Sequence, residues 1–243
     1  MAEGVIPQSA TVSFRRPDCE VQEGLAFARV SMDRLREVVP WRTFRWHAGQ
    51  THYSGFYWSS TMRDHVIYES RLELSRLLLA DFDPAVSFIA AQPFLLSAQV
   101  AGVARKHVPD FLLETDRGPV VVDVKPERKL ADAAVRAALG WARQAVEQRG
   151  WEYEVASEVP SVRLENIRFL AGYRRPWLFD PGALAVVFGR VVDGMTVCEA
   201  VAAVPELSAH AARAAVLHLL WLGRLHADLD EPLGSSPLMV AAQ

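Results

Sequence analysis

Cysteine is scarce in this chain: among 243 residues only Cys19 and Cys198 are cysteines, and they lie far apart. Two isolated thiols provide neither the ligand spacing of a zinc site nor the framework of a disulfide-rich domain. A low cysteine content is typical of proteins from a reducing compartment. The sequence therefore argues against a cysteine-based zinc module and against a disulfide-stabilised secreted fold.

Long apolar runs are also missing. The longest stretches fall short of the ~20 residues that a membrane-spanning helix needs. The N-terminus has no basic patch followed by an apolar run, as a signal peptide would have. Neither an internal repeat nor a low-complexity tract is present. We therefore expect a soluble, cytoplasmic protein that has no membrane partner.

The chain also lacks a strong excess of positive charge. The chain has 26 Lys and Arg against 29 Asp and Glu, a formal net charge of −3. A protein that binds nucleic acid through its overall charge is strongly basic. If DNA is the partner, a local basic surface must contact its backbone, or another protein must deliver it.

Apolar periodicity and turn residues predict a mixed α/β arrangement up to about residue 175. A helix is expected over Asp64–Asp81, where Leu74, Leu77 and Leu78 recur at helical spacing. The polar first fifteen residues predict no regular element. Strands are expected at 53–58, 86–90, 94–100, 107–114, 119–125 and 151–156, and further helices at 131–149 and 164–172. This order predicts a mixed sheet flanked by helices.

The pattern changes at Arg174-Arg175-Pro176. After it the sequence is alanine-rich and mainly helical, with helices expected at 181–191, 197–204 and 209–222 and short strands at 224–228 and 238–240. Three helices and a hairpin are typical of a winged-helix module. We therefore predict two domains, residues 1–175 and residues 176–243.

The strongest chemical pattern is Val-Pro-Asp ending at Asp110, followed after a turn by Asp123-Val124-Lys125. Side chains alternate between the faces of a strand, so Asp123 and Lys125 share one face ~7 Å apart. Asp110 lies on the neighbouring strand of the predicted hairpin and can converge on the same point. A charged residue inside an apolar strand is costly unless it is paired or binds a metal. The alternative is a structural hairpin with a surface Asp–Lys pair.

This residue set suits phosphodiester hydrolysis. Carboxylates can hold Mg²⁺, with Mn²⁺ as a substitute, while leaving room for water and a phosphate oxygen. The metal activates the water, and a lysine beside it stabilises the transition state. A third acid is expected from the first helix, where Glu69 and Glu73 lie four residues apart on one face.

Other residues near this pattern allow two interpretations each. Arg105 and Lys106 can contact a DNA backbone or lie in a solvated turn. His107 as a general base is disfavoured, because this chemistry does not require one. Gln92 is expected to bond the backbone near the site. The helix at 209–222 carries few side chains suited to reading bases, so the C-terminal module is predicted to bind protein rather than DNA.

The order of short motifs along the chain resembles the TnsA nuclease domain of heteromeric transposases, over about residues 54 to 173. The stretches that carry the resemblance are Ser70–Leu74, Gln92–Phe94, Asp110–Leu112, Val124–Pro126 and Glu165–Ile167. The resemblance implies a restriction-endonuclease-like fold of the PD-(D/E)xK superfamily. It also implies DNA as substrate, a DDE transposase that cuts the other strand at transposon ends, and an ATPase regulator.

Carried over by position, the resemblance makes Glu73, Asp110 and Asp123 metal-binding acids and Lys125 the catalytic lysine. It favours Glu73 over Glu69. Asp123 departs from the glutamine of the family's best-known member and restores the acid of the superfamily pattern. Two alternatives stay open: another restriction- or repair-type nuclease of the same fold, and a non-catalytic winged-helix adaptor that binds DNA or protein.

Overall fold

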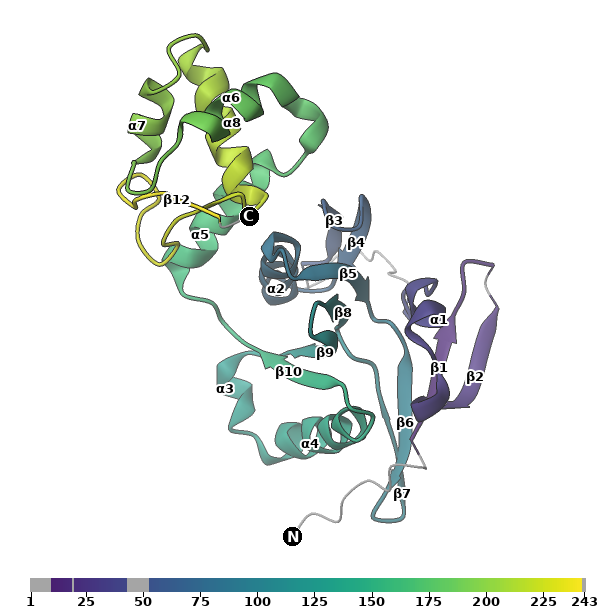
Figure 1. Ribbon diagram of the computed structural model, residues 1–243. Helices are drawn as coiled ribbons and strands as arrows, with labels where there is room; N and C mark the ends of the chain where they lie inside the picture. The colour runs from purple at the N-terminus through teal and green to yellow at the C-terminus, as the bar shows by residue number, and fades with distance from the viewer. Residues whose placement is uncertain (1–9, 19, 43–52, 242–243) are drawn as a thin grey trace. The chain divides into compact units, whose positions relative to one another are not determined.

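A computed structural model describes residues 10–18, 20–42 and 53–241 (Figure 1). The chain divides into two compact units. The first comprises Met1–Leu77 and Ala85–Glu158, and the second comprises Leu78–Pro84 and Val159–Gln243. Among the described residues no helix combines the length and the apolar character that crossing a membrane requires.

One sheet of the first unit is antiparallel and has the strand order β2-β1-β6-β7. Its strands are β1 (Thr11–Arg15), β2 (Val21–Ala26), β6 (Leu95–Val100) and β7 (Val103–His107). The expectation of no regular element before residue 15 is wrong. Val12 and Phe14 are fully or almost fully buried, and their alternation with polar neighbours makes β1 an internal strand.

The other four-stranded sheet of this unit is mixed, with the order β10-β9-β8-β5. Its strands are β5 (Val86–Ala91), β8 (Phe111–Thr115), β9 (Gly118–Val124) and β10 (Glu152–Ala156). β10 runs parallel to β9, and the other pairs are antiparallel. The connection from β9 to β10 contains α3 (Glu127–Leu130) and α4 (Ala133–Glu147).

Helix α4 packs on a core that the two sheets share. Trp141 and Val146 of α4 are buried with Val121 of β9 and Leu96 of β6 in one apolar cluster. A parallel strand pair needs a crossover of this kind, usually helical. The mixed sheet flanked by helices confirms the predicted fold class, which is that of restriction-endonuclease-like proteins.

The helix expected over Asp64–Asp81 begins later than predicted. Asp64–Tyr68 is strand β4, which pairs antiparallel with β3 (Gly55–Ser59), and helix α2 is Arg71–Phe82. Val66 and Tyr68 are buried on one face of β4 while Asp64 and His65 are exposed. Val66, Ile67 and Tyr68 favour strands, and the helical spacing of Leu74, Leu77 and Leu78 applies only to the part that forms α2. Two short elements, η2 (Phe27–Arg29) and α1 (Met32–Arg36), precede the hairpin.

The second unit is mainly helical. Its elements after residue 158 are α5 (Ser161–Leu170), η3 (Ala171–Tyr173), η4 (Pro176–Leu178), α6 (Pro181–Arg190), α7 (Val197–Ala202), α8 (Ala209–Trp221), β11 (Leu225–His226) and β12 (Met239–Val240). β11 and β12 pair antiparallel. The predicted order of three helices and a hairpin is present, and its assignment as a winged helix stays a prediction.

The predicted domain boundary lies inside this second unit, at the start of η4. The division by compactness falls instead between Glu158 and Val159, before α5. Asn166 of α5 donates hydrogen bonds to the carbonyls of Leu229 and Glu231. These bonds attach α5 to the C-terminal segment. The boundary at residue 176 stays a prediction about domains.

Candidate active site

The backbone around Asp110 is fixed from two sides. The Asp110 amide donates to the Val122 carbonyl at 3.0 Å, which joins this residue to β9 just before β8 begins. The Asp110 carbonyl accepts from the amide of Gln92 at 2.9 Å, as expected for a residue that bonds the backbone near the site. Gln92 is buried and has a φ of 46°. This left-handed conformation is unusual for a residue other than glycine, and it turns the chain from β5 towards β6.

The Asp110 carboxylate and the Lys125 ammonium are in contact. Oδ2 of Asp110 accepts from the Val124 amide at 2.6 Å and from Nζ of Lys125 at 3.3 Å. Nζ also donates to the Val124 carbonyl at 2.9 Å. Burial raises the pKa of Asp110, the charge of Lys125 lowers it, and the charge of Asp123 raises it. The side chains of Lys125 and Asp110 are 31% and 20% exposed, so solvent and substrate can reach the pair.

Asp123 has other partners. Its carboxylate is completely buried, and Nε2 of His107 lies 2.9 Å from Oδ1 and 2.7 Å from Oδ2. The Tyr153 hydroxyl also donates to Oδ2. A carboxylate accepts hydrogen bonds, so the His107 tautomer that suits both contacts is the one with its hydrogen on Nε2. Burial first, and then the Asp123 charge, raise the pKa of Tyr153, which therefore stays protonated as a donor.

Glu73 is held by the residues that begin its own helix. The Glu69 amide donates to Oε2 of Glu73 at 2.7 Å, and the Ser70 hydroxyl donates to Oε1 at 2.9 Å. The Ser70 Oγ in turn accepts from the Glu73 amide at 3.1 Å, so Ser70 caps α2. Burial raises the pKa of Glu73 to about 7; these hydrogen bonds oppose the rise, and the Asp110 charge adds to it.

The structure thus places some of the predicted site residues in contact and gives others different partners. Asp110 and Lys125 are hydrogen-bonded, and the charge of Asp110 acts on Glu73. Asp123 influences the pKa of Asp110 but makes its hydrogen bonds with His107 and Tyr153. The sequence interpretation did not identify these two residues as partners of Asp123. Strand alternation within the β8–β9 hairpin gave no signal for them, because His107 and Tyr153 belong to other strands, β7 and β10.

The donor set suits a hard divalent cation. In the part of the chain that the structure describes, no group of three or more His, Cys, Asp or Glu side chains is arranged to hold a metal ion. Mg²⁺, however, commonly uses one or two carboxylates and keeps several waters. The Lys125 ammonium already lies between two oxygens, Oδ2 of Asp110 and the Val124 carbonyl. The mutual repulsion of Asp110 and Glu73 would also be relieved by a cation.

Arg105 and Lys106 lie in strand β7, an edge strand, and not in the turn that was one of the two expectations. Both side chains are exposed. His107 ends the same strand and so belongs to the antiparallel sheet, not to the β8–β9 hairpin in which it was expected. The strand therefore carries two basic side chains next to the residue that bonds Asp123.

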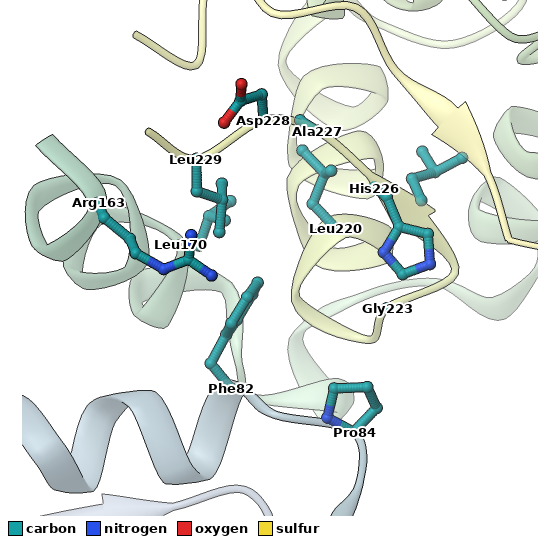
Figure 2. A pocket seen from close by; sticks show the side chains of 11 residues that line it. Phe82, Pro84, Arg163, Leu170, Leu220, Gly223, His226, Ala227, Asp228 and Leu229 are labelled. Atoms are coloured by element: carbon teal, nitrogen blue, oxygen red, sulfur yellow. The ribbon is translucent and has the colours of Figure 1, made fainter. Parts of the chain in front are cut away.

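The second unit contains a cavity of about 230 Å³ (Figure 2). Most of its wall is apolar, and polar side chains come from Arg163, His226 and Asp228. The apolar contributors are Phe82, Pro84, Leu170, Leu220, Leu225, Ala227 and Leu229. None of the predicted site residues lines this cavity, so it is not the predicted active site.

Comparison with models of known protein families identifies part of the first unit. Residues 83–158 match the family model described as TnsA-like endonuclease N terminal. The matched segment includes Asp110, Asp123 and Lys125, as well as His107 and Tyr153. Glu73 and residues 159–243 lie outside it. No curated protein matches the chain.

Proposed function

We propose that this chain, whose residues 83–158 match the model of the TnsA-like endonuclease N-terminal family, is the strand-cutting subunit of a heteromeric transposase and requires a divalent metal. The observation that carries the proposal is the contact between Asp110 and Lys125 within the matched segment. An acid that can hold a cation and an amine that can stabilise a phosphate are adjacent and partly exposed.

Asp110 and Glu73 are the residues that would hold Mg²⁺, or Mn²⁺ in its place. Each carboxylate is oriented by backbone amides, Val124 for Asp110 and Glu69 for Glu73. When bound, the ion supplies Lewis acidity to the attacking water and to the phosphate. Glu73 is preferred to Glu69 because its carboxylate faces the charge of Asp110. The ligand role predicted for Asp123 requires that its carboxylate exchange a bond with His107 or Tyr153.

Lys125 acts on the reacting groups. Its ammonium is held at the site by the Val124 carbonyl and by Asp110. From there it orients the water and stabilises the charge that develops on the phosphate oxygens. The water oxygen bonds to phosphorus while the bond from phosphorus to the 3′ oxygen breaks. The products are a 3′-hydroxyl and a 5′-phosphate.

The match to the TnsA-like family model supports the proposed substrate and partners. DNA is the substrate, one strand at transposon ends is the target, and a DDE transposase and an ATPase regulator are the partners. The net charge of −3 supports a need for partners, because the chain lacks the positive charge for tight unaided DNA binding. Arg105 and Lys106 would supply local contacts with the backbone of the DNA.

The C-terminal unit would bind a partner protein. Helix α8 buries most of its residues and presents few polar side chains, among them His210 and Arg213. A helix that reads DNA bases usually carries several Arg, Lys, Asn or Gln side chains. We therefore do not expect the C-terminal unit to bind DNA sequence-specifically through α8.

Strand cleavage tests this function directly. The full chain is incubated at micromolar concentration with labelled duplex DNA, with and without the partner transposase, in Mg²⁺, in Mn²⁺ and in EDTA. We expect metal-dependent cuts that leave a 3′-hydroxyl and a 5′-phosphate, and we expect Asp110→Ala to abolish them. Equal cleavage by Asp110→Ala, or cleavage in EDTA, would reject the proposed function.

A further inference from the structure

Asp123 and Lys125 are two residues apart, so strand alternation predicts that their side chains share one face, about 7 Å apart. In the structure the two side chains have different partners. Lys125 donates to Asp110 at 3.3 Å, and Asp123 bonds His107 and Tyr153. The two carboxylates thus have separate hydrogen-bond partners.

The network around Asp123 is built from three separated strands. Tyr153 lies in β10 beside Val121 of β9, in the parallel register that places the two residues opposite one another. His107 ends β7, in the other sheet, and its ring packs edge-on against Trp141 of α4 at 6.2 Å. Two donors with fixed positions therefore satisfy a carboxylate that has no solvent contact. A buried charge is tolerated only with such partners.

The same contacts argue against direct metal binding by Asp123. Mg²⁺ is reluctant to lose its waters, and the Asp123 side chain is completely buried. Both carboxylate oxygens already accept hydrogen bonds. Asp110 differs, because its carboxylate is partly exposed and its hydrogen bonds all involve Oδ2.

We infer that His107 and Tyr153 hold Asp123 as a positioning residue, and that this keeps the Asp123 carboxylate away from Lys125 and leaves the Lys125 ammonium on Asp110. The inference rests on the proposed nuclease function. Through Asp123, His107 also connects β7, with Arg105 and Lys106, to β9, which ends just before Lys125. His107 therefore both holds the Asp123 carboxylate and links the basic strand β7 to the proposed active site.

His107→Leu tests whether His107 holds Asp123 away from Lys125, because leucine has an apolar side chain of similar size but cannot donate a hydrogen bond to Asp123. We expect the single-turnover cleavage rate at saturating DNA to fall about 10- to 100-fold, the range seen when a residue behind an active-site group is lost. The affinity for Mn²⁺, measured by calorimetry, should stay unchanged. His107→Gln should recover most of the rate, because its amide Nε2 can donate as the imidazole does.

A second substitution at Asp123 distinguishes the positioning role of His107 from a merely structural one. Asp123→Asn removes the competing charge, so the double variant His107→Leu with Asp123→Asn should cut faster than His107→Leu alone. Loss of the packing between His107 and Trp141 would not be repaired by that change. If His107→Leu fails to fold, Tyr153→Phe, which deletes one oxygen, provides the same pair of measurements.

Two results would overturn the inference. The first is a loss of Mn²⁺ affinity in Asp123→Asn as large as that in Asp110→Asn, which would make Asp123 a ligand. The second is a double variant no faster than the single donor variant. Failure of the proposed function itself would look different, because the unchanged protein would then neither bind Mn²⁺ nor cut DNA.

Discussion

Lys125 donates a hydrogen bond to Asp110 at 3.3 Å although Asp123, two residues before it in the same stretch, is the nearer acid in the sequence. The amine is thus placed beside the partly exposed carboxylate, not beside the buried one. A lysine in this position can reach a phosphate that approaches Asp110. Both the catalytic role proposed for Lys125 and the positioning role inferred for Asp123 depend on that placement.

Removal of the Lys125 amine should impair the chemical step. We expect Lys125→Ala to lower the single-turnover cleavage rate about 10²- to 10³-fold, the usual cost of losing a donor that stabilises transition-state charge. The far-UV circular dichroism should be unchanged, since the side chain is 31% exposed. Lys129→Ala removes the same charge from exposed α3 and serves as the matched control. Equal losses in the two variants would contradict the assignment.

The stability of the metal-free protein should fall as the pH rises towards neutrality. The pKa of Glu73 is raised from 4.5 to about 7 in the folded chain. The folded state therefore holds the Glu73 proton more tightly than the unfolded state does. Its stabilising contribution is complete below pH 4.5 and is lost as the pH rises through about 7.

The size of that loss is at most about 3 kcal/mol, from the shift in pKa, and partial solvent exposure of Glu73 reduces it. Urea denaturation of the metal-free chain between pH 5 and pH 8 measures it. Glu73→Gln keeps the shape but does not titrate, so its stability should fall less over this range. The idea fails if the wild type and Glu73→Gln show the same dependence on pH.

Arg105 and Lys106 should contribute to DNA affinity without contributing to the chemistry. Each contact with a phosphate releases counterions, so Arg105→Ala and Lys106→Ala should each reduce the slope of log affinity against log salt by about one. The cleavage rate at saturating DNA should change little. Arg213→Ala, in α8 of the second unit, is the control and should leave the slope as it is. A slope unchanged by all three substitutions would remove β7 from the DNA interface.

The left-handed backbone of Gln92 should matter for both stability and activity. Its φ of 46° disfavours a β-branched side chain. We expect Gln92→Val to lower the free energy of unfolding by about 1–2 kcal/mol through this conformation. Gln92→Asn, which tolerates it, should cost less. Because the Gln92 amide bonds the Asp110 carbonyl, the valine variant should also cut more slowly; a valine variant as stable as the asparagine one would contradict this.

The hairpin that carries Asp110 and Lys125 was predictable because its determinants are local. The turn at Asp116-Arg117 joins β8 and β9, and Gly118 has a φ of 118° that favours glycine. The apolar runs on each side, Phe111–Leu113 and Val120–Val122, then mark its two strands. The match of residues 83–158 to the TnsA-like family model includes this hairpin.

The pairing of Asp123 was not predictable from the sequence. His107 and Tyr153 reach it from β7 and β10, two strands outside the β8–β9 hairpin. Only the parallel register of β10 and the approach of the second sheet bring them together. The start of α2 was misplaced for a related reason. Strand β4 is stabilised by pairing with β3, which helical spacing counted along one segment does not detect.

Binding of a divalent cation by Asp110 is the central claim, and calorimetric titration of Mn²⁺ into the metal-free full chain at pH 8 tests it most directly. The proposed site predicts saturable binding to the wild type and its loss in Asp110→Asn, with the fold of the variant intact. Binding of equal affinity to both proteins, or no binding to the wild type, would contradict the claim.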